Sequence, residues 1–290
     1  MAFGALEEIL EQCSREGEPF WRVVLKDDIN ERNVTEEESI RQMEELWDAM
    51  LLAAALYDKK LNSHSGLTGG DGGRMEAYVQ KGDTLSGPFI GQVIAGALQM
   101  GESNACMKRI VAAPTAGACG VLPAVLVPYF REKKASVQQI IEALYVAAGI
   151  GQVIAVRASI AGASGGCQAE IGTASAMAAG ACVQLKGGTD SQIAQASAMA
   201  LKNLLGLVCD PVAGLVEVPC VKRNVIGAVN ALAAADMALA GIESRIPPDQ
   251  VFDAMKEVGD KMAKELKETG EGGLAGTVAG REIAAKILGK

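Results

Sequence analysis

Alanine- and glycine-rich apolar stretches, separated by breaks at glycine or proline, fill the chain from Phe89 to about Ile242. They lack the sustained alternation of apolar and polar residues that marks a half-buried strand, and β-branched residues do not gather into strand-length runs. Apolar residues make up 49% of the chain and aromatic residues only 4%, so small side chains build the core and let helix backbones approach closely. The sequence therefore predicts an all-α fold, a single large helical domain with long, glycine-rich functional loops.

Local signals mark where several helices begin. Thr35 with Glu38 fits a capping box, in which each residue satisfies a backbone N–H group of the other, and Ser136 with Gln139 forms a second one. Apolar residues at helical spacing follow both. Pro247, at the head of a Pro-Pro-Asp sequence, starts the clearest helix, which we expect to be the last in the chain.

One domain is expected, because no tandem repeat and no shift in composition divides residues 1–290. Residues 1–60 are predicted to form an N-terminal helical segment, either scaffold or a docking face for a partner chain, and residues 61–290 a helical core. Residues 62–74, which read Asn-Ser-His-Ser-Gly-Leu-Thr-Gly-Gly-Asp-Gly-Gly-Arg, are expected to form a polar loop.

The charge balance and the cysteine count exclude several classes of protein. The formal net charge is −8, and no basic run is present to neutralise phosphates, so no nucleic-acid partner is expected. Seven cysteines are too few for a disulfide scaffold, and Met1–Glu8 lacks the basic n-region of a secretory signal. The predicted location is a reducing cytoplasm, where cysteines serve as core residues, metal ligands or nucleophiles.

An uncharged stretch, Ile110–Phe130, is long enough to span a bilayer. Proline and glycine interrupt it at Pro114, Gly117, Gly120, Pro123 and Pro128. Because such breaks are unfavourable in a lipid-facing helix, the stretch is predicted to be a buried helix–turn–helix, and no membrane association is expected.

Three cysteines lie in glycine- or proline-flanked segments, which read Gly-Gly-Cys167-Gln, Cys209-Asp-Pro and Val-Pro-Cys220. Glycine lets a chain approach a bound cluster closely, and proline stiffens the loop that carries a ligand. Three thiolates on a cubane iron–sulfur cluster would leave one iron without a protein ligand, so that this iron can act as a Lewis acid.

The spacing of these cysteines matches neither zinc fingers nor the dense ferredoxin pattern, so buried core cysteines remain the alternative interpretation. For Cys13, Cys106 and Cys182 we favour the core interpretation. Cys119, in Gly-Ala-Cys-Gly, fits either interpretation: a buried core residue or a residue that lines the site.

Five segments carry a family resemblance. They are residues 65–71 (SGLTGGD), 113–120 (APTAGACG), 165–172 (GGCQAEIG), 207–220 (LVCDPVAGLVEVPC) and 271–275 (EGGLA). On these segments the chain closely resembles the α subunit of the iron–sulfur-dependent bacterial L-serine dehydratases, and the similarity runs over nearly the whole chain.

The resemblance implies a largely helical catalytic domain with a [4Fe–4S] cluster held by Cys167, Cys209 and Cys220. It implies that the protein deaminates L-serine to pyruvate and ammonia. A separate β chain is also implied, in an α/β heteromer, because this sequence lacks the Ser-Ser-His-Thr-Met-Gly-Pro segment of the family's β part. Single-chain relatives place a terminal cysteine on the open iron, whereas this chain ends Ile-Leu-Gly-Lys, so no such self-inhibition is expected.

The glycine-rich loop is the predicted substrate-binding segment. Ser65, Thr68, Gly69 and Gly70 are interpreted as a cradle for the substrate carboxylate, since hydroxyls and exposed N–H groups suit an anion. Asp71 is the candidate partner of the substrate ammonium group. A tight structural turn is the alternative interpretation of the same residues.

The general base is the least determined assignment. His64 is the only histidine in the chain and lies in the glycine-rich loop, while Lys108 and Glu170 are further candidates. Thr68 and Thr115 complete the catalytic candidates, with Thr115 expected to donate to the substrate or to cluster sulfide.

Three other functions compete with this interpretation. A pyridoxal-phosphate dehydratase would need a Schiff-base lysine and alternating strands and helices, and neither is evident. Cluster-dependent β-elimination on L-cysteine or L-threonine stays open, because a pocket rejects one extra methyl group by only about 1–3 kcal/mol. A non-catalytic helical or membrane subunit is the third.

Overall fold

The computed structural model describes residues 3–133 and 135–289, so both ends of the expected domain 1–290 lie outside the described residues. Within them the fold is helical, and the β-type pairing is an isolated bridge between Cys209 and Lys267. The all-α prediction is confirmed.

The α-helices run in chain order as follows: α1 (Leu6–Glu16), α2 (Phe20–Arg32), α3 (Glu36–Ala55), α4 (Asp71–Gln80), α5 (Gly87–Ala105), α6 (Val121–Lys133), α7 (Val137–Arg157), α8 (Gly162–Gly165), α9 (Thr173–Leu185), α10 (Asp190–Lys202), α11 (Cys220–Leu239), α12 (Pro248–Lys261) and α13 (Val278–Leu288). Short turns of 3₁₀ helix, η1 (Ala116–Ala118), η3 (Val212–Gly214) and η4 (Lys264–Leu266), and a π-helical turn, η2 (Gln168–Gly172), lie between them.

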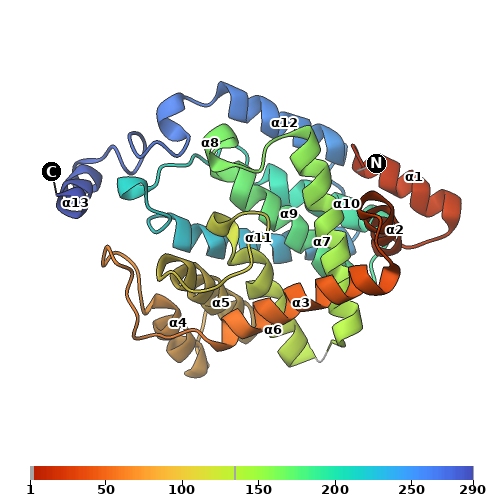
Figure 1. Cartoon of the computed structure of the whole chain (residues 1–290), viewed down its shortest axis with the longest axis horizontal. Coiled ribbons are helices and arrows are strands. Elements are labelled where there is room, and N and C mark those ends of the chain that lie inside the picture. The colour runs from red at the N-terminus through yellow and green to blue at the C-terminus, as the bar shows by residue number, and fades with distance from the viewer. Residues whose placement is uncertain (1–2, 134, 290) are drawn as a thin grey trace.

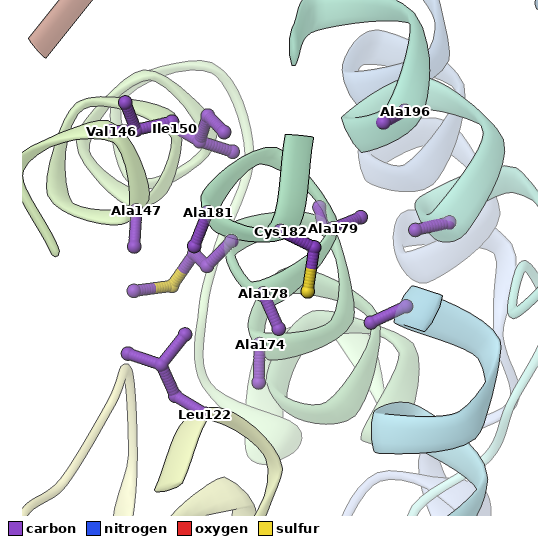
Figure 2. Packing of buried hydrophobic residues seen from close by; sticks show 14 of the residues in the cluster. Leu122, Val146, Ala147, Ile150, Ala174, Ala178, Ala179, Ala181, Cys182 and Ala196 are labelled. Atoms are coloured by element: carbon purple, nitrogen blue, oxygen red, sulfur yellow. The ribbon is translucent and has the colours of Figure 1, made fainter. Parts of the chain in front are cut away.

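Helix α9 is the centre of the molecule, with α6, α7, α10 and α11 packed around it (Figure 1). It is apolar or small on all sides, as expected for a helix that faces no solvent, and every residue from Thr173 to Val183 is buried. Figure 2 shows alanines of α9 close to Val146 and Ala147 of α7 and to Leu122 of α6. Cys182 belongs to this core, as predicted, and burial raises the pKa of its thiol to about 12.

Glycine sets the distance between some of these helices. Gly149 of α7 faces α2, and a Cβ atom at this position would lie 2.5 Å from Cγ2 of Val24. Val24 is buried and β-branched, so it has little freedom to move aside.

Gly149→Ala should therefore destabilise the fold by about 1–3 kcal/mol, measured as a lower urea midpoint at unchanged slope. Gly96→Ala in α5 is the matched control, because a Cβ atom there would meet Cα of Ala124 at an ordinary 3.4 Å. Removing a helical glycine should raise stability at that site by up to about 1 kcal/mol. Equal effects at both positions would contradict the overpacking argument.

The N-terminal helices are part of this core. The Thr35 capping box is formed, and so is the one at Ser136. Helix α3 buries the predicted apolar face, on which Trp47 is 1% exposed and packs edge-to-face on Phe130, with ring centroids 5.5 Å apart. This face of the segment 1–60 is therefore scaffold.

The expected helix–turn–helix at Ile110–Phe130 is wrong. Residues 110–115 are irregular, and a single helix, α6, follows η1 and continues through Pro123 and Pro128. Pro123 stands in the first turn, where its missing N–H group is not needed. Burial of the Val121–Val127 side chains compensates for the hydrogen bond that Pro128 removes.

Two further boundaries differ from the prediction. The polar loop ends at Gly70, because α4 begins at Asp71. The helix after Pro247 is not the last one in the described residues, since it ends at Lys261 and α13 follows.

One helix in the described part of the chain, α7, is long and apolar enough to cross a membrane. Its most apolar window has a mean hydropathy of 1.6, and 67% of that window is buried inside the fold. Burial of this kind is typical of a central core helix.

Candidate metal centre

Three segments far apart in the chain bring the three predicted ligands into one buried region. Cys167 lies between α8 and η2, Cys209 follows α10 in an extended segment, and Cys220 is the first residue of α11. All three side chains are buried. The first two segments are joined directly, because the Gln168 N–H donates to the Leu207 carbonyl oxygen at 2.9 Å.

The sulfur atoms of Cys167 and Cys209 and a carboxylate oxygen of Glu170 all lie within 4.8 Å of one another. Cys220 is not in this group, but its thiol interacts electrostatically with both others, and burial raises its pKa to about 12. The hydrogen bond between Cys167 and Cys209 lowers the pKa of Cys167 and raises that of Cys209, so Cys167 ionises first. Such sulfur donors suit iron or zinc and not magnesium or calcium.

The Glu170 carboxylate points into this group because two glycines leave room for it. A Cβ atom at Gly162 would lie 2.8 Å from Glu170 Oε2 and 3.1 Å from Cys209 Sγ. At Gly117 it would lie 2.9 Å from Glu170 Oε1. Thr115 Oγ1 donates to Glu170 Oε1 at 2.5 Å, so one carboxylate oxygen is held in place.

Burial raises the pKa of Glu170, against the lowering effect of the Thr115 hydrogen bond, and the negative charge of Glu268 raises it further. A buried carboxyl with a raised pKa next to potential metal ligands is a candidate for proton transfer. From the sequence, Glu170 was one of several base candidates. Sequence reasoning did not favour it over Lys108, although its position three residues after Cys167, on the same side of a helical turn, is a signal that could have singled it out.

The C-terminal segment closes over Cys209 through the backbone. The Cys209 N–H donates to Leu266 O at 2.8 Å, and the Glu268 N–H donates to Cys209 O at 2.7 Å. The neighbouring Asp210 is 3% exposed, and its Oδ2 accepts the Leu274 N–H at 2.8 Å. The 271–275 segment therefore lies against the cysteine segment.

The glycine-rich loop lies beside the segment that leads to Cys220. The hydroxyls of Ser63 and Ser65 donate to the carboxylate of Glu217, at 2.5 Å and 2.8 Å to Oε2. The loop is closed by the Ser63 N–H, which donates to Thr68 O at 2.8 Å. Glu217 is 6% exposed, and no local sequence signal indicates this pairing.

The predicted cradle residues Gly69 and Gly70, and Asp71 after them, have backbone conformations and contacts that serve the fold. Gly69 has a φ of 152°, and a Cβ atom there would lie 2.4 Å from Leu61 O, so close chain packing requires glycine. Gly70 precedes α4 in the left-handed conformation. At the start of α4, the Asp71 N–H donates to the buried Glu102 carboxylate at 2.6 Å. Substrate binding by this loop stays a prediction.

The other base candidates lie in different surroundings from Glu170. His64 and Lys108 are exposed, whereas Glu170 is partly buried beside the two cysteines. Asp71, the predicted ammonium partner, forms an ion pair with Lys222 at 3.1 Å.

The remaining cysteines differ in burial and in surroundings. Cys13 and Cys182 lie in the hydrophobic core, as predicted. The core interpretation is wrong for Cys106, which is only partly buried because it follows the last turn of α5. Cys119 is buried and directs its sulfur at Met100 O, 3.8 Å away on α5.

Comparison with known proteins gives concordant matches. A family model described as "Serine dehydratase alpha chain" matches residues 15–275. The chain is 49% identical to a probable L-serine dehydratase, alpha chain, of Bacillus subtilis over 92% of this chain and 89% of the relative. It is 42% identical to an L-serine dehydratase, alpha chain, of Peptoniphilus asaccharolyticus over 97% of each. An L-serine dehydratase of Streptomyces coelicolor is 38% identical over 85% of this chain and 55% of its own length.

Proposed function

Because the chain belongs to the family of serine dehydratase alpha chains, we propose that it deaminates L-serine to pyruvate and ammonia with a [4Fe–4S] cluster held by Cys167, Cys209 and Cys220. The observation that carries the proposal is the convergence of Cys167, Cys209 and Glu170 within 4.8 Å, close enough to Cys220 that, besides burial, the charges of Cys167 and Glu170 raise the pKa of its thiol. These residues come from three separate segments, so their meeting is a property of the whole fold.

The donor set fits a cluster of this kind. The three thiols are buried, and sulfur is the ligand that iron–sulfur clusters prefer. The absent side chain of Gly162 leaves space beside Cys209 Sγ that a Cβ atom would fill. When bound through three thiolates, the cluster would supply a Lewis-acidic iron that weakens the carbon–oxygen bond of the substrate hydroxyl.

Glu170 is the proposed general base. Thr115 holds Oε1, so Oε2 is left to accept the α-proton of L-serine. As the Cα–H bond breaks, its electron pair forms the Cα–Cβ double bond and hydroxide leaves from Cβ. The aminoacrylate product then tautomerises to iminopyruvate, which water hydrolyses to pyruvate and ammonia.

For substrate binding we keep the loop residues Ser65, Thr68, Gly69 and Gly70 as the carboxylate cradle, with Asp71 for the ammonium group. The single hydroxyl proton of Ser65 is donated to Glu217, so this role requires the hydroxyl to turn to the substrate carboxylate when L-serine binds. His64 is less well supported as base, since it is exposed.

We further propose that residues 1–290 form one catalytic domain. Its core, residues 61–290, holds both the cluster and the substrate. The domain works in the cytoplasm with a separate β chain. The names of two relatives, which specify an alpha chain, support the heteromer. The greater length of the Streptomyces relative, named without a chain, is consistent with a fused second part.

Anaerobic reconstitution tests the proposal. With its β chain, the reconstituted protein should contain about four irons and four acid-labile sulfides per α chain and form pyruvate from L-serine. Activity should fall on exposure to air. Assays with L-cysteine and L-threonine identify the preferred substrate, and full activity in air without iron would contradict the proposal.

A further inference from the structure

Arg223 contacts two of the three ligand segments and belongs to the third. It lies on α11, one turn after Cys220. Its Nη1 donates to Cys167 Sγ at 3.5 Å and to Val208 O at 2.7 Å, and it forms an ion pair with Asp210 Oδ1 at 2.9 Å. One guanidinium therefore joins the Cys167, Cys209 and Cys220 segments.

The surroundings hold this guanidinium firmly. The side chains of Arg223 and Asp210 are 14% and 4% exposed, and a buried charge is tolerated only when it is paired and hydrogen-bonded. The second oxygen of Asp210 accepts the Leu274 N–H, and a Cβ atom at Gly273 would lie only 2.4 Å from that oxygen. The backbone at Gly273 therefore lies close against the Asp210 carboxylate.

The chemistry of arginine suits this place better than that of lysine. Its Nη1, which makes all three contacts, is fixed in the rigid guanidinium plane and stays charged when buried, whereas a lysine ammonium is a flexible point charge whose pKa shifts readily on burial. A donor to the sulfur of a cluster ligand stabilises the more negative, reduced cluster, which raises its reduction potential.

We propose that Arg223 is a positioning residue for the metal centre. Its side chain holds Cys167 and the Cys209 segment in place relative to Cys220 and donates a hydrogen bond to a ligand sulfur. The inference rests on the proposed function for the identity of the cluster. The positioning role itself concerns contacts within the chain.

The test compares R223Q and R223K with the wild-type chain after anaerobic reconstitution. R223Q should move the reduction potential, followed by electron paramagnetic resonance, to more negative values, and should lose absorbance of the cluster in air about 10-fold faster. R223K should have a reduction potential between those of R223Q and the wild type, because the positive charge remains. It should still lose the cluster nearly as fast as R223Q. R157Q is the control, since it removes the Arg157–Asp253 pair, whose side chains are 24% and 51% exposed, at a site elsewhere, and should match the wild type.

A second measurement uses the cluster-free chain. R223Q should speed amide hydrogen exchange at Cys209 and Leu274, whose N–H groups donate to Leu266 O and Asp210. R157Q should leave it unchanged. A wild-type chain that takes up no iron would contradict the proposed function and the effect of Arg223 on the reduction potential. Faster amide exchange in R223Q would, in that case, still support the role of Arg223 in positioning the cysteine segments. The inference would be overturned if R223Q had the same exchange rates, the same reduction potential and the same rate of cluster loss as the wild-type chain.

Discussion

Cys167→Ser, Cys209→Ser and Cys220→Ser should each abolish cluster retention and lower serine turnover at least about 10³-fold. A bound Lewis acid stabilises the transition state by several kcal/mol, and about 4 kcal/mol corresponds to this factor. Each substitution removes a buried thiol for which a hydroxyl is a poor substitute as an iron ligand. Iron and sulfide analysis of the anaerobically purified variants, with a pyruvate assay, measures both effects.

Cys13→Ser and Cys182→Ser make the same chemical change in the hydrophobic core, away from the metal centre. Both should keep the iron content of the wild type, although a buried hydroxyl lowers stability slightly. If Cys220→Ser alone kept its iron, the two thiols grouped with Glu170 would form a different kind of site.

Glu170→Gln should lower turnover by about 10²–10⁴-fold while iron and sulfide stay at the wild-type level. The amide keeps the size of the side chain and can still accept the Thr115 hydrogen bond, but it cannot take a proton. Single-turnover assays with reconstituted protein measure the loss. A Glu170→Gln variant with wild-type turnover would remove this residue from the mechanism.

The pH dependence follows from the raised pKa of Glu170. A base works only when ionised, so turnover should fall as the pH drops through this pKa, at a higher pH than the ordinary carboxyl value of about 4.3. Glu268→Gln removes a negative charge that raises the pKa, so the acidic limb should move to lower pH. An unmoved limb would show that a different group controls the rate.

Much of the fold was predictable because its causes are local. Capping boxes at Thr35 and Ser136 depend on residues three apart, and both formed as expected. The errors arose where packing overrode a local preference. Pro128 lies inside α6, because the buried side chains of that helix stabilise it more than one missing backbone hydrogen bond costs.

The candidate metal centre was predictable only as a list of residues. Glycine and proline next to Cys167, Cys209 and Cys220 identified the segments, but not the groups that surround them. Glu217 and Ser65, 152 residues apart, meet only through the tertiary fold. Arg223 is likewise distant in sequence from Cys167, and no spacing rule relates the two.

The backbone pairing of Cys209 with residues 266–268 has a consequence for biosynthesis. During translation, Cys167, Cys209 and Cys220 are synthesised before residues 266–268, the segment that pairs with Cys209. The nascent chain therefore exposes its thiols until the Leu274 amide reaches Asp210. If the three cysteines hold the proposed cluster, their thiols are open to metal delivery until residues 266–274 dock, and the docked segment then covers Cys209.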